Sequence, residues 1–379
     1  EDVTNVDSVG LITARSGVHL SGGQITVGTG VTIGIAGIAT FRSGRIDVGD
    51  SLQNTSIGEA AGDAITTGDQ NTAIGGNALT ANTTGGTNTG VGYAALDANT
   101  TGSGNVAVGL NALGANTTAS NNTAVGSESL KANTTGTGIC AFGREALEAN
   151  TTADYNSAFG INAMNANTTG DTNAAFGSYA LDANTTGDQN VAVGHNALTT
   201  LNPSSNADMC NVAVGYNAGY SMTTGTQNIS VGAYSLDALT TGADNVAIGT
   251  GTLGVATTGN YNIGIGSNAL DATTTASDNV GIGVNALTAN TTGAENIAIG
   301  KGALYANTTG AYNIGIGDNA LGTNTTASNN TAIGKNALAA NETGADNTAV
   351  GMYSLDANTT GGSNTSVGYN SLTTATTAS

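Results

Sequence analysis

The sequence repeats itself every 17 residues over most of its length. With Asn54 as the first position of a repeat, Asn recurs at steps of 17 as far as Asn190, and Ile139 takes its place once. After a four-residue insertion near residues 199–210, Asn resumes at 211 and continues at the same step to 364. These 19 repeats have the consensus N-x-A-[IV]-G-x-N-A-L-x-A-N-T-T-G-x-x. A fixed period of this kind is typical of a solenoid, in which stacked coils share one core.

The composition restricts which proteins this chain can resemble. Only 9% of its 379 residues are charged, and it has 58 Gly, one Pro and no Trp. Such a chain is either disordered or a repeat protein with a thin shared core, and the strict period favours the repeat protein. The net charge of −19, with seven Lys and Arg, disfavours a nucleic-acid partner. No apolar run is long enough for a membrane span, so we expect no membrane insertion.

Two columns of the repeat are large and apolar. The fourth position is always Ile, Val or Phe, and the ninth is Leu or Met in all but two repeats. The fifth position is Gly in every repeat, which predicts either a positive φ or a contact too close for a Cβ atom. We predict that the fourth and ninth positions form the interior. The predicted structural ladder in two adjacent repeats consists of Asn71, Ile74, Gly75, Leu79, Asn88, Val91, Gly92 and Leu96.

The third position is restricted to Ala, Gly or Ser, and the eighth to Ala or Ser apart from Thr252. Neighbouring strand residues face opposite ways, so an inward fourth position predicts an outward third position. A surface open to water would accept any polar residue there. We therefore predict that this small-residue face packs against other copies of the chain, in a homotrimer.

The repeat predicts an all-β fold, a parallel β-solenoid or β-roll of 17-residue coils. Each coil is expected to hold two short strands, near positions two to four and eight to eleven, with bends at Gly and at N-T-T-G. The first Asn column is expected to form a hydrogen-bonded ladder. We assign residues 54–379 to the solenoid and residues 1–53 to an irregular β segment, a β-prism or β-helix cap.

Several segments resemble known fibre proteins. The segments beginning Asn71-Thr-Ala-Ile-Gly and Asn105-Val-Ala-Val-Gly resemble the N-S-V-A-I-G head repeats of trimeric autotransporter adhesins. The full repeat resembles phage and virus tail-fibre-like proteins, and the segment from Asn5 to Val18 is similar to fibre proteins of marine cyanophages. The resemblance implies a trimeric β-roll, and in many such fibres a C-terminal chaperone trimerises the chain and is then cleaved off.

We therefore expect the shaft of a phage tail fibre or similar extracellular fibre, which projects a receptor-binding tip. The expected partners are further copies of the chain, other fibre or virion proteins and, in some fibres, a cell-surface glycan. One alternative is a bacterial trimeric surface adhesin that binds glycans or matrix through its tyrosines, all 11 of which lie in variable columns. A second alternative is an ice-binding solenoid. No paired carboxylates stand out, so we expect neither an enzyme nor a cofactor.

Few residues suggest a local site. The insertion holds the single proline of the chain and interrupts the period, and loops often carry function. Its candidate interaction residues are Leu201, Asn202, Pro203, Ser204 and Ser205. Cys140 and Cys210 lie about four coils apart, too far for a disulfide within one chain, so both are predicted to be free thiols. His195 has no neighbouring ligand residues, and we predict no metal site.

Overall fold

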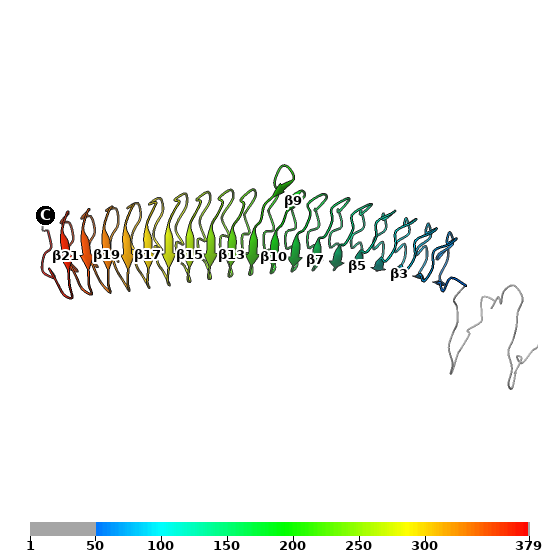
Figure 1. Cartoon of the computed structure of the whole chain (residues 1–379), viewed down its shortest axis with the longest axis horizontal. Helices are drawn as coiled ribbons and strands as arrows, with labels where there is room; N and C mark the ends of the chain where they lie inside the picture. Colours follow the sequence, from blue (N-terminus) through cyan, green and yellow to red (C-terminus); the bar gives the residue numbers. More distant parts are fainter. Residues whose placement is uncertain (1–50, 378–379) are drawn as a thin grey trace, which may run out of the picture. The chain divides into compact units, whose positions relative to one another are not determined.

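The computed structural model describes residues 51–377 of the chain. The predicted N-terminal segment, residues 1–53, falls almost wholly outside the described residues. In the described part, the coils follow one another in a row, and the strands stack side by side along it (Figure 1).

The 17-residue repeats form one parallel sheet of 19 strands, and two further short strands pair beside it. Each strand of the sheet pairs in register with the strand of the next coil, so that Thr72 lies beside Thr89 and Ile74 beside Val91. Across the insertion the same register continues, with Val191 beside Val212. The predicted parallel β-solenoid is confirmed. The strands are β1 Thr55–Ile57, β2 Thr72–Ile74, β3 Thr89–Val91, β4 Val106–Val108, β5 Thr123–Val125, β6 Cys140–Phe142, β7 Ser157–Phe159, β8 Ala174–Phe176, β9 Gly187–Asp188, β10 Val191–Val193, β11 Ala207–Asp208, β12 Val212–Val214, β13 Ile229–Val231, β14 Val246–Ile248, β15 Ile263–Ile265, β16 Val280–Ile282, β17 Ile297–Ile299, β18 Ile314–Ile316, β19 Thr331–Ile333, β20 Thr348–Val350 and β21 Thr365–Val367.

The opposite wall of each coil contains no strand, so the prediction of two strands per coil is wrong. Positions six to eleven form consecutive turns, in which Asn77 and Leu79 have φ of 59° and 52°. Left-handed residues at alternate positions prevent an extended chain. These turns still bond from coil to coil, since the Leu79 N–H donates to the Ala95 carbonyl at 3.0 Å. The second wall is therefore a stack of turns.

The strand side of the interior is reversed with respect to the predicted one. Ala73, at the third position, is buried, whereas Ile74 at the fourth is 37% exposed. The coil is thin, because the strand lies directly against the Leu column of the opposite wall. At Gly90 an added Cβ would lie 3.3 Å from Leu79 Cγ, so the third position has room for little more than a methyl group. The prediction that the small residues face outward and join the copies is wrong.

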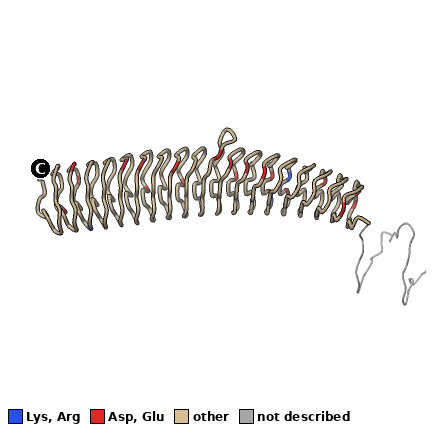
Figure 2. The backbone as a smooth tube through the Cα atoms, viewed as in Figure 1, with Lys and Arg blue, Asp and Glu red and all other residues tan. Residues whose placement is uncertain are grey.

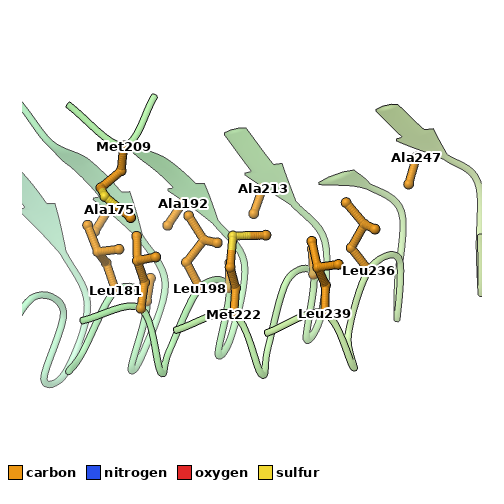
Figure 3. Packing of buried hydrophobic residues seen from close by; sticks show 14 of the residues in the cluster. Ala175, Leu181, Ala192, Leu198, Met209, Ala213, Met222, Leu236, Leu239 and Ala247 are labelled. Carbon is orange, nitrogen blue, oxygen red and sulfur yellow. The ribbon is translucent and has the colours of Figure 1, made fainter. Parts of the chain in front are cut away.

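Figure 3 shows this packing near the centre of the chain. The strand alanines, among them Ala192 and Ala213, point toward Leu198 and Met222 of the opposite wall. Leu79 and Leu96 of the predicted ladder are fully buried, as predicted for the ninth column. The ninth position thus supplies a large side chain of the core in most coils, and Met222 replaces it from the twelfth position in the coil where the ninth residue is Gly219. The third and eighth positions supply mainly alanine or a similarly small residue.

Asn side chains form two buried columns within the stack. In the first, Asn71 accepts the Asn88 N–H at 2.9 Å through Oδ1 and donates through Nδ2 to the Gly85 carbonyl at 2.9 Å, which confirms the predicted ladder. The second column, at the twelfth position, was not predicted as a ladder. There Asn99 donates to Asn82 Oδ1 at 2.9 Å. The Asn of the repeat consensus at this position was the signal for it, and both columns satisfy buried backbone carbonyls.

The invariant glycines have both properties that the sequence suggested. Gly75 has φ of +129°, and a Cβ atom added to it would lie 2.4 Å from the carbonyl oxygen of Gly92. The same close approach recurs between successive coils along the stack. Any side chain at the fifth position would therefore push two coils apart.

We expect Gly300→Ala to destabilise the solenoid by about 3 kcal/mol, since it combines backbone strain with a backbone clash. An added Cβ would lie 2.6 Å from the Gly317 carbonyl. The control is Gly302→Asn in the same coil, where φ is +62° and nothing lies within 4 Å of the added Cβ. Asn already occupies this position in most repeats. Thermal unfolding followed by circular dichroism measures both variants, and equal melting temperatures would contradict the expectation.

Candidate functional site: the exposed apolar sheet face

The outer face of the 19-stranded sheet carries two columns of side chains, from the second and fourth positions of each coil. These side chains point away from the core because the third position points into it. Many are large, apolar and more than one-third exposed, which is unusual for a sheet with one covered face. We call these two columns the sheet face. Its exposed members include Ile57, Ile74, Val108, Phe142, Phe176, Val191, Ile229, Ile248, Ile263, Ile265, Ile299, Ile333 and Val367.

The sheet face carries no charge. None of the 19 described strands that form it contains a charged residue, although the chain has a net charge of −19. The charges lie elsewhere on the coils, scattered along the row (Figure 2). For example, Lys131 pairs across the turns with Glu128 at 3.3 Å and with Glu148 at 3.5 Å. The separation leaves one side of each coil apolar and places the charge on the others.

The size of the sheet face matches an interface better than an ordinary protein surface. Nineteen strands at about 4.8 Å extend roughly 90 Å, and three residues per strand span about 10 Å, which gives roughly 900 Å². The largest apolar patch of a typical monomer is about 300–600 Å². A standard protein interface covers about 800 Å² on each partner.

Three consecutive strands, β6 to β8, place phenylalanine at the fourth position. The rings of Phe142, Phe159 and Phe176 stack along the sheet face with centroids 4.8 Å apart and planes within 7° of parallel. This spacing is the distance between neighbouring strands, so the register of the sheet produces the stack. Phe142 and Phe176 remain 36% and 42% exposed.

A second exposed aromatic group lies on the turns that follow the strands. Tyr179, His195, Tyr216 and Tyr234 come from four successive coils, with ring centroids 6.0, 5.6 and 5.4 Å apart. We call them the aromatic row. Beside it, Asn196 donates to Asn217 Oδ1 at 3.2 Å. Exposed rings next to amide groups can bind partners that have both apolar and hydroxyl surfaces.

The structure divides the candidate residues of the insertion into two groups. Leu201 and Pro203 are buried, and they anchor the loop to the stack together with Met209. Asn202 is exposed and accepts a hydrogen bond from the Thr185 hydroxyl at 2.7 Å. The tip consists of Ser204, Ser205 and Asn206, all exposed. The short strands β9 and β11 pair at the base of the loop. Its tip, together with Asn202 and Asp208, is open to a partner.

The tenth column carries several half-buried carboxyl groups. Burial raises the pKa of Asp97, Asp182 and Asp271 above the usual 3.8. Burial, and after it the nearby Asp271 charge, also raises the pKa of Asp237. Gly114 in this column leaves an open depression of about 320 Å³, which Asp97, Asn111, Ala115 and Lys131 also line.

These shifts make the described solenoid more stable in acid. A raised pKa means that the folded chain binds the proton more tightly than the unfolded chain, so stability falls as pH rises from 3.8 through the raised pKa. We expect a higher melting temperature near pH 4 than at pH 7. The triple variant Asp182→Asn, Asp237→Asn, Asp271→Asn should reduce that difference, and Asn165 already occupies the same column. If the triple variant kept the same difference in melting temperature between pH 4 and pH 7, these three carboxyl groups would not be its cause.

Neither cysteine forms a disulfide in the structure. Cys140 is half-exposed and belongs to β6, where it faces outward at the second position, and Cys210 is exposed at the end of the insertion. Within residues 51–377 no three His, Cys, Asp or Glu side chains gather in a way that could hold a metal ion. The same part of the chain contains no helix that is long and apolar enough to cross a membrane.

Comparison with known proteins yields no match to a family model and none to a curated protein.

Proposed function

We propose that the chain forms the shaft of a homotrimeric extracellular or virion fibre, of the kind that projects a receptor-binding tip. The observation that carries this proposal is the uncharged, apolar sheet face that runs along all 19 strands of the sheet. Water exposure of such a face is unfavourable by roughly 25 cal/mol per Å². If copies of the chain turned their sheet faces toward a common axis, these faces would be removed from water.

The coil architecture supports a mechanical role. Every coil bonds to the next through strand pairs, stacked turns and the Asn columns, so bending or opening the rod would break several bonds per coil. At about 4.8 Å per coil, the described part extends roughly 90 Å. A rod of this kind holds two ends apart at a fixed distance, which is what a fibre shaft does.

The surface proposed for assembly differs from the one expected from the sequence. The small third and eighth positions fill the interior of the coil and cannot join copies. The larger Ile, Val and Phe side chains of the fourth position, with those of the second, form the proposed contact instead. Self-association thus rests on hydrophobic burial of large side chains.

We expect Ile265→Lys to disrupt the trimer, because it would bury an unpaired charge in the contact. The control is Val284→Lys, in which an apolar residue with 47% exposure on a turn, away from the sheet face, is changed in the same way. Sedimentation equilibrium should give a trimer mass for the native chain and the control, and a lower mass for Ile265→Lys.

The two natural cysteines report on the same contact. In the assembled chain Cys140 should react slowly with a thiol reagent and Cys210 quickly, whereas both should react quickly after unfolding. A native mass of one chain, together with equal reaction of both thiols, would refute the proposal.

A second candidate function is glycan binding by a surface adhesin, and the aromatic row favours it. Under this alternative, Tyr216→Ser with Tyr234→Ser should abolish binding to a glycan array, since both rings are about half-exposed. Tyr93→Ser, at an exposed tyrosine several coils away, is the matched control. No array binding by the native chain would remove this candidate.

Ice binding has less support. A flat array of threonines would suit it, but threonine occupies the second position only in strands toward the two ends of the sheet, β1–β3, β5 and β19–β21. Between them the sheet face is mainly Val and Ile. A thermal-hysteresis measurement tests it directly.

A further inference from the structure

The side chains of the two columns of the sheet face vary in size in opposite directions. Fourth-position Phe occurs in three strands, and the second-position residues of those strands are Cys140, Ser157 and Ala174. In each of the other 16 strands of the sheet the second position is Thr, Val or Ile and the fourth is Ile or Val. The largest residues of one column therefore lie only beside the smallest residues of the other.

Packing within one chain does not account for this match. Phe142 and Phe176 remain 36% and 42% exposed beside their small neighbours, so each residue keeps a large open surface in the single chain. The rings also stack 4.8 Å apart along the sheet face, each at the level of its own coil. Side chains that face water need not match one another in volume. Side chains in a close-packed contact must do so.

We propose that copies of the chain pack in parallel with their coils at the same level, so that each Phe of β6, β7 and β8 fits over the small second-position residue of the same strand in the next copy. The inference rests on the shaft proposal and adds the register to it. Strands run across the rod, so rotation about an axis along the rod brings the fourth position of one copy toward the second position of its neighbour at the same level. The match therefore holds whether two or three copies surround the axis.

An antiparallel arrangement does not preserve the match. Reversing one copy end to end would bring the level of β6 opposite that of β16, where the second and fourth positions are Val280 and Ile282. Phe142 would then meet a full-sized side chain, and Cys140 would face a gap. Overpacking and cavities in one contact both destabilise it.

Thiol cross-linking tests the register in the full chain. In a Cys210→Ser background, chains that keep Cys140 are mixed with chains that carry both Phe142→Cys and Cys140→Ser, so that the thiols at positions 140 and 142 stand on different copies. A short bifunctional thiol reagent should join different copies, as peptide mapping of mixed isotope-labelled chains would show. The variant Val280→Cys in the Cys210→Ser background is the counterpart, since a half-turn about the strand direction places Val280 opposite Cys140 only in the antiparallel arrangement. Cross-links between copies with Val280→Cys, or none between Cys140 and Phe142→Cys, would overturn the inference.

A second measurement tests the volume match itself. Ser157→Ile should shift dissociation of the assembly to at least tenfold higher protein concentration, because Phe159 lies at the same level. Thr348→Ile should change it by less than about twofold, because Ile beside Val already occurs in β13. Both changes raise β-propensity, so a single chain would be stabilised by either one. If both variants shifted the dissociation concentration equally, the proposed volume match would be refuted.

The outcomes separate the inference from the shaft proposal. A native chain that sediments as a single copy would overturn both. A native trimer that lacks the Phe142→Cys cross-link would overturn the register alone and leave the shaft proposal standing. Circular dichroism of each variant confirms that its coils are folded before the assembly is measured.

Discussion

In-register pairing between coils is the constraint on which the rest of the structure depends. Because Thr72 lies beside Thr89, and every later residue beside its equivalent, each side chain has the side chain of the same repeat position about 4.8 Å away in the neighbouring coils. A column must therefore accept its own residue as neighbour. Asn does so because its amide both donates and accepts, and Phe does so by stacking. Like charges repel at this distance. Asp154, Asp171 and Asp188 nevertheless stack in successive coils, where each carboxylate accepts a backbone N–H from the preceding coil.

The thin interior follows from the same stacking. One wall of the coil is a three-residue strand and the other is a series of turns with Leu in a left-handed conformation. The two walls lie so close that a Cβ at Gly90 would touch Leu79. Opposite the strand there is room for one large side chain, and further large side chains such as Leu239 are buried where the coil turns. The remaining apolar side chains of the strand must face outward, and this leaves the sheet face without a cover within the chain.

The uncovered face links the architecture to the proposed role. A single column of such coils leaves the large apolar side chains of its sheet face partly in water, and assembly along that face would give the rod a second core. The aromatic row and the tip of the insertion lie outside this face, so the proposed assembly would not cover them through the sheet-face side chains. The fold thus separates a surface suited to self-association from surfaces that can meet other partners.

The sequence by itself determined the period, the parallel solenoid, the invariant glycine turn and the first Asn ladder, because each follows from a residue that recurs at a fixed step. It did not determine which way the strand faces. Alternation along the strand establishes that Ala73 and Ile74 point to opposite sides. Hydrophobicity alone would place Ile74 rather than Ala73 in the interior, which is wrong. Only the tertiary structure decided this, since the distance between the two walls, which no single repeat encodes, admits Ala73 and excludes Ile74.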